Sequence, residues 1–173
     1  MANPTRTLLQ ANIRWLLQAL ELLDRIDDRA YVASPEGFAP HRAGGHLRHI
    51  LEFYQCFLDG LGTLQIDYDA RRRDHTVEVS RIAAAAAIRR ILLALETSSG
   101  LSGDTVVWVR EEDGETFLES SVNRELQVLS SHTIHHFALL ALTLRLHGVE
   151  MDPDFGMAPS TLRHQRTVAA EAA

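Results

Sequence analysis

Four long stretches of the sequence carry apolar residues at the three- and four-residue spacing of amphipathic helices. Segments rich in glycine, proline or charged residues separate the stretches. A chain with this pattern buries its apolar stripes most simply by packing the helices against one another. The sequence therefore predicts an all-α fold, a four-helix bundle, with helices over about residues 4–27, 43–61, 77–97 and 122–146.

The segment between the third and fourth predicted helices alternates with a period of two residues instead. Residues 105–109 and 116–118 are β-rich, and Asp113-Gly114 lies between them. An Asp-Gly pair between two such runs is a strong signal for a hairpin turn. We therefore expect a small β-hairpin, with Thr76 capping the third helix and Ser121 capping the fourth.

The length of 173 residues suits one domain with a sizeable core. We expect residues 1–173 to form this single domain, with residues 149–173 as a C-terminal tail. Residues 151–163 should wrap over the bundle, and the chain should fray at residues 169–173.

Charge and composition exclude several classes of function. The net charge of -6 argues against a nucleic-acid partner or an anionic membrane surface, and no apolar run approaches the ~20 residues of a membrane span. Every basic side chain is arginine, so Schiff-base chemistry and lysine general bases are excluded. A single cysteine, Cys56, cannot form an internal disulfide and lies among apolar residues. We expect a cytoplasmic protein in which Cys56 is a packing residue rather than a nucleophile.

Histidines are the candidate functional residues. His132 and His136 belong to the apolar stripe of the fourth predicted helix, one above the other, whereas His135 is turned roughly 100° away. His46 and His49 are predicted to point inward from the second helix. Three inward histidines suit a divalent metal site with open positions, as in catalytic sites. In the alternative interpretation, the histidine pair is metal-free and is satisfied by mutual and backbone hydrogen bonds.

The charged segment after the second helix is a second candidate. Tyr68, Asp69, Arg71 and Arg73 are the substrate-orienting candidates, because clustered charges and a tyrosine could hold an anionic substrate. A solvated loop is the alternative interpretation of the same residues.

Two short segments resemble the DinB/YfiT superfamily, whose members share a four-helix bundle and a metal-binding histidine triad. The segments are Gly-His-Leu-Arg-His-Ile-Leu at residues 45–51 and Ser-His-Thr-Ile-His-His-Phe at residues 131–137. The resemblance in helix order covers most of residues 3–148, and residues 67–71 and 154–163 resemble one subgroup. The tryptophan common just before the second helix in this family is replaced here by His41-Arg42.

The resemblance also implies which histidines bind the metal. The first histidine of the family triad precedes an apolar pair, which favours His49 over His46, the second choice. We therefore expect a divalent transition metal, zinc or nickel, on His49, His132 and His136.

The resemblance implies no single activity, because many relatives have no known reaction. Some relatives transfer low-molecular-weight thiols, and others are described as metal-dependent hydrolases. We expect a thiol-dependent S-transferase, with a low-molecular-weight thiol as a second cofactor. The alternatives are a metal-dependent hydrolase and a non-catalytic, metal-stabilised binding protein. A homodimer is a further expectation, because the leucine-rich first helix could keep apolar surface after the bundle has formed.

Overall fold

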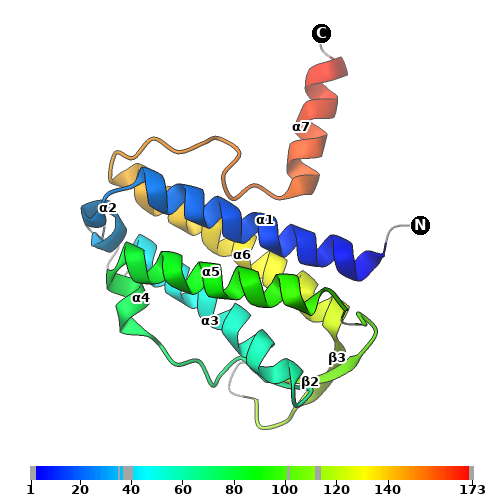
Figure 1. Cartoon of the computed structure of the whole chain (residues 1–173). Helices are drawn as coiled ribbons and strands as arrows, with labels where there is room; N and C mark the ends of the chain where they lie inside the picture. Colours follow the sequence, from blue (N-terminus) through cyan, green and yellow to red (C-terminus); the bar gives the residue numbers. More distant parts are fainter. Residues whose placement is uncertain (1–2, 35, 37–40, 101, 112–113, 172–173) are drawn as a thin grey trace.

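The computed structural model describes residues 3–34, 36, 41–100, 102–111 and 114–171. Four long helices run alongside one another and form the bundle (Figure 1). This arrangement confirms the predicted all-α, four-helix fold. The long helices are α1 (Pro4–Arg25), α3 (Ala43–Leu61), α5 (Arg81–Thr97) and α6 (Val122–Leu146). The shorter elements are α2 (Asp28–Val32), β1 (Gln65–Asp67), α4 (His75–Val79), a 3-10 turn (Ser98–Gly100), β2 (Val106–Arg110), β3 (Leu118–Ser121) and α7 (Pro159–Glu171).

The apolar stripes of the four long helices meet in one core, as their spacing predicts. Removing these side chains from water is the main driving force that holds the bundle together. The largest fully buried members on these helices are Leu16, Leu47, Ile50, Tyr54, Phe57, Ile88, Leu95, Leu126 and Phe137.

The third predicted helix is divided into two, α4 and α5. Asp74, not Thr76, caps α4, because its side chain accepts a hydrogen bond from the backbone N–H of Thr76 at 2.9 Å. Ser80 then adopts an extended backbone and caps α5 by accepting from the N–H of Ala83 at 3.2 Å. The prediction of one continuous helix over residues 77–97 is therefore wrong at its start. Two capping side chains satisfy the free N–H groups, so the interruption costs little.

The predicted hairpin is present, because β2 and β3 pair antiparallel, with Val107 opposite Ser120. The prediction that Ser121 caps the following helix is confirmed, since its side chain accepts from the N–H of Arg124. Asp113, in the predicted turn, lies outside the described residues.

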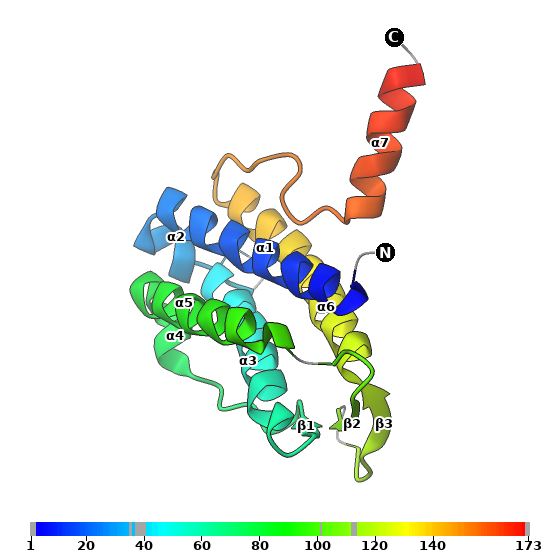
Figure 2. The same cartoon turned by 45° about the vertical axis from the view of Figure 1, so that its right-hand side comes forward.

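A third strand, β1, pairs parallel with β2 in the segment that the sequence suggested was an irregular connection. The sheet order is β1-β2-β3, and the sheet lies at the end of the bundle where α3 ends and α6 begins (Figure 2). Gly60 permits this contact, because a Cβ atom there would lie 2.5 Å from the carbonyl oxygen of Gln65. The chain therefore reverses direction directly after α3, and residues 68–71 lie alongside α3.

The C-terminal tail follows the prediction only in its first part. Met151 and Phe155 are buried, and the ring of Phe155 stacks on Phe137 with centroids 4.7 Å apart. Residues 159–171, however, form α7, which has no buried residue and extends away from the bundle in both views (Figures 1 and 2). The predicted wrapping of residues 151–163 is therefore wrong for residues 159–163, which belong to α7, because the mostly polar and small side chains of α7 give it little apolar surface to bury. None of the described helices is long and apolar enough to cross a membrane.

Candidate metal centre

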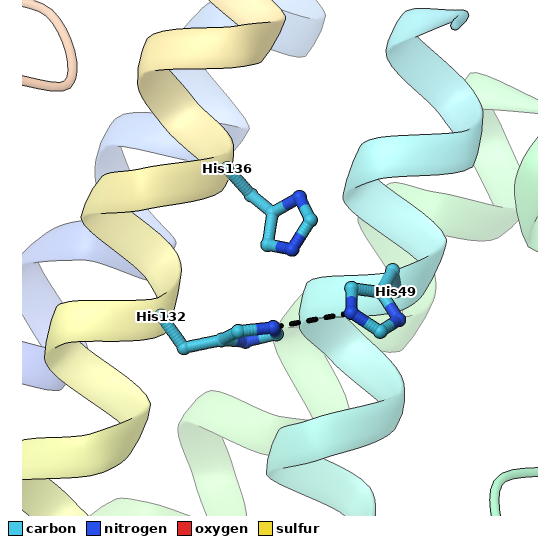
Figure 3. Close-up of side chains that lie close together, drawn as sticks. All are labelled: His49, His132 and His136. Atoms are coloured by element: carbon cyan, nitrogen blue, oxygen red, sulfur yellow. Dashed lines mark hydrogen bonds between the residues drawn. The ribbon is translucent and has the colours of Figure 1, made fainter. Parts of the chain in front are cut away.

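Three histidine side chains meet in the space between α3 and α6 (Figure 3). His49 comes from α3, and His132 and His136 come from successive turns of α6, where the four-residue spacing puts them on one face. One ring nitrogen of each side chain lies within 4.8 Å of one ring nitrogen of each of the others. The structure thus brings together the three residues that the sequence selects for a metal site.

The separation of the facing nitrogens suits a shared metal ion. The Nε2 atoms of His49 and His132 are 3.1 Å apart. Two imidazole nitrogens bound to one ion at about 2.1 Å lie about 3.4 Å apart in a tetrahedral site and about 3.0 Å apart at adjacent octahedral positions. The planes of the three rings cross at 65° or 71°, so the rings meet by their edges and nitrogens rather than by stacking.

The three imidazoles are neutral near pH 7. Burial lowers the pKa of His49 to about 4 and the pKa values of His132 and His136 to about 3. Neighbouring positive charges lower them further, including Arg71 for His49 and His132. Neutral imidazole is the form that binds metal ions. Three neutral nitrogen donors that already face one another therefore fit a divalent transition metal.

His46 lies behind His136 rather than within the triad. The Nδ1 atoms of the two rings are 3.1 Å apart, so one of them donates a hydrogen bond to the other. With Nδ1 of His136 engaged in this way, its other nitrogen is turned toward His49 and His132 (Figure 3). A second hydrogen bond of this kind orients metal-binding histidines in proteins and fixes their tautomer. The structure therefore gives His46, the second-choice ligand, the position of a residue that supports His136.

A buried polar network fixes the helices next to the triad. The hydroxyl of Tyr54, on α3, donates to the Oδ1 atom of Asn12, on α1, at 2.7 Å and lies 3.2 Å from the hydroxyl of Thr133, on α6. Asn12 in turn donates to the backbone carbonyls of Leu8 and Leu126. All three network side chains are fully buried. Because Thr133 directly follows His132, these bonds help to set the position of α6 along the axis of α3.

Phe53 supports His132, and the sequence analysis did not identify it. Its ring stacks on His132 with centroids 3.9 Å apart and on Tyr68 with centroids 4.8 Å apart. The usable signal was its position four residues after His49, on the same helix face. Tyr68 is fully buried, and its hydroxyl donates to Glu125 at 2.9 Å. The interpretation of Tyr68 as part of a solvated loop is therefore wrong; its ring belongs to the core beside the histidines.

The other three substrate-orienting candidates lie in different surroundings. Asp69 is half-buried, and its backbone N–H donates to the carboxylate of Asp67. Arg73 is exposed and has a positive φ of 51°. Arg71 is half-buried, with its guanidinium carbon 5.0 Å from the centre of the Phe53 ring. Of these three, Arg71 is the one whose charge affects the pKa values of the histidines.

A separate cavity of about 220 Å³ lies between α3, α5 and the segment after β1. Its lining includes Cys56 and the charged residues Arg48 and Glu52, but none of the three histidines. Burial raises the pKa of the Cys56 thiol to about 11, so the reactive thiolate is scarce near pH 7. Cys56 therefore offers no ready thiolate nucleophile to this cavity.

The sequence matches no family model. A stretch of 105 residues is 36% identical to FK506-binding protein 5 of Rhizopus delemar, and the match covers 57% of this chain and 27% of that protein. The chain thus spans about a quarter of the length of this relative.

The structure is similar to the crystal structure of a DinB-like protein, YjoA, from Bacillus subtilis. The TM-score is 0.62 with 17% sequence identity, and the match covers 85% of this chain and 96% of that one. An identity this low speaks for the fold alone, and the fold agrees with the resemblance found in the sequence. The chain therefore has the DinB-like fold, with a cluster of histidines that could hold a metal ion.

Proposed function

We propose that this protein is a thiol-dependent transferase that binds one divalent transition metal, zinc or nickel, through His49, His132 and His136. The observation that carries the proposal is the convergence of three neutral imidazoles from two helices, with two Nε2 atoms 3.1 Å apart. Three protein ligands leave coordination positions open for a small molecule. When bound, the metal would supply a Lewis acid that lowers the pKa of a coordinated thiol.

The residues of this chain favour a nucleophile that comes from a bound small molecule over one that a protein side chain supplies. Cys56 holds its proton, and the chain has no lysine. The carboxylate of Glu125 accepts hydrogen bonds from Tyr68 and Ser120, and that of Glu52 accepts from Arg48. These two buried acids are thus occupied away from the triad. A hydrolase would need an acid or base to activate water, so hydrolysis is the second candidate.

The first experiment measures metal content. Protein purified without a histidine tag is reconstituted with zinc or nickel, and bound metal is determined by elemental analysis. We expect close to one equivalent in the wild type and much less in His132→Ala and His136→Ala. His75→Ala and His164→Ala are matched controls, because both side chains are exposed and lie away from the triad. Wild-type protein that binds no more metal than the two triad variants would refute the proposed site.

The second experiment tests the reaction. The metal-loaded protein is screened with several small cellular thiols against chlorinated aromatics, epoxides and maleyl-type acids. We expect thiol addition that requires metal and disappears in His132→Ala. A folded, metal-loaded protein that hydrolyses esters or amides but adds no thiol would assign the protein to the hydrolase alternative instead.

A further inference from the structure

Arg71 is a half-buried cation beside the proposed metal centre. Its guanidinium contacts the Phe53 ring, the same ring that stacks on His132. Among the described residues, Arg71 makes no ion pair and no hydrogen bond. Three other arginines of this region are paired: Arg48 with Glu52 and Glu78, Arg72 with Asp59, and Arg110 with Asp67.

Positive charge lies close to the triad. The charge of Arg71 lowers the pKa values of both His49 and His132, and that of Arg48, which is itself paired with Glu52 and Glu78, lowers the pKa of His49. A divalent ion held by three neutral imidazoles would add two further positive charges. Half-buried charge of one sign is unfavourable unless a group of opposite sign neutralises it. The site would therefore attract an anionic ligand.

The planar shape of the Arg71 guanidinium indicates which kind of anion the site would bind. A guanidinium presents parallel N–H donors in a plane, and these match the two oxygens of a carboxylate. One guanidinium also balances the single charge of a carboxylate. Arg71 and His132 both contact the Phe53 ring, and the charge of Arg71 is close enough to lower the pKa values of His49 and His132, so the guanidinium lies near the open metal positions.

We infer that Arg71 binds the carboxylate of the small molecule that occupies the open metal positions, so that the site selects ligands with an anionic end. This inference rests on the proposed metal function and narrows its ligand to carboxylate-bearing thiols or substrates. Arg71 is a specificity residue in this scheme, because it binds the ligand away from the sulfur or other atom that contacts the metal.

The test uses cobalt(II)-loaded protein and two nearly isosteric thiols, 3-mercaptopropionate and its neutral amide, 3-mercaptopropionamide. Binding is followed by the absorption band between thiolate sulfur and cobalt, which is independent of turnover. A charge-assisted pair is worth about 10- to 100-fold in affinity. We expect the wild type to prefer the carboxylate by this factor, Arg71→Gln to lose the preference, and Arg71→Lys to keep part of it. Arg72→Gln is the matched control, because Arg72 is the exposed neighbour and pairs with Asp59.

The outcomes separate this inference from the proposed function. The d–d absorption of cobalt in Arg71→Gln shows whether the metal centre itself is intact. If cobalt binds but the wild type does not distinguish the two thiols, or Arg71→Gln keeps the preference, the inference is overturned and the metal site stands. If cobalt does not bind the wild type at all, the proposed function fails, and the role of Arg71 fails with it.

Discussion

Metal binding should release almost no protons from the three histidines, even at pH 6. Three histidines with the ordinary pKa of about 6.5 would together hold about 2.3 protons at pH 6, and metal would have to displace them. With pKa values of about 4 for His49 and about 3 for His132 and His136, the three together hold about 0.01 proton at this pH. A water on bound zinc, with a pKa of about 7, would add about 0.1 proton.

The physical reason lies in the geometry as well as in burial. Two protonated imidazoles cannot both remain with their Nε2 atoms 3.1 Å apart, because each would present an N–H and a positive charge to the other. The free protein therefore holds the rings neutral, in the form that the metal requires.

Isothermal titration calorimetry measures this proton count directly. Zinc is titrated into the protein at pH 6 in several buffers with different ionisation enthalpies, and the slope of observed enthalpy against buffer enthalpy gives the number of protons released. We expect a slope below about 0.2 at pH 6. Release of two or more protons would show that the free histidines are solvated and cationic, and would refute the reasoning from burial and contact.

The same pKa shifts make a prediction for the metal-free protein. The folded pKa values of the triad lie below the unfolded value of about 6.5, so between these values the unfolded state binds more protons than the folded state. The stability that the neutral triad contributes is fully present above about pH 6.5 and is lost as the pH falls toward about 4 for His49 and about 3 for His132 and His136. Urea denaturation at pH 7, 6 and 5 should therefore show a decreasing free energy of unfolding, and His132→Ala should reduce this dependence. An unchanged slope in that variant would contradict the assignment.

Three further predictions follow from the site and its supports. His49→Ala should lose most of the metal affinity, whereas His46→Ala should lose only about 10- to 100-fold, as measured by competition with a chelator. The reverse ranking would make His46 the ligand. Zinc at a hundredfold excess over its dissociation constant should raise the free energy of unfolding by about 2.7 kcal/mol, and no thermal shift on adding zinc would count against a native-state site. Tyr54→Phe should lower the free energy of unfolding, measured by urea denaturation, by about 1–3 kcal/mol, because it leaves the buried Oδ1 of Asn12 without a hydrogen-bond donor. Thr133→Val should lower it less, because the carbonyl of Leu129 still accepts the backbone N–H of residue 133 when the hydroxyl is lost. Equal losses in the two variants would argue against this account of the network.

Local spacing was enough to predict much of the fold. The four long helices, the hairpin and the cap at Ser121 each depend on residues close together in the chain, so periodicity and turn chemistry identify them. The division of the third helix was missed, because Asp74 and Ser80 cap two separate helices and the apolar spacing continues across the break. Strand β1 was missed because its partner, β2, lies about 40 residues further along the chain.

The sequence by itself determined that His132 and His136 share one face of a helix, since a spacing of four residues in an α-helix leaves no other arrangement. The family resemblance favoured His49 over His46, but the helix pattern alone left both pointing inward. The tertiary structure decided that His49 lies in the triad and that His46 supports His136, because this depends on how far α3 is shifted along α6. Side-chain packing and the buried hydrogen bonds of Tyr54 set this shift of α3 along α6. The positions of Tyr68 and Arg71 were likewise decided by tertiary structure, because the close approach at Gly60 and the pairing of β1 with β2 bring a charged segment back against Phe53. Composition describes such a segment as solvated, and only contacts between distant parts of the chain place it beside the histidines.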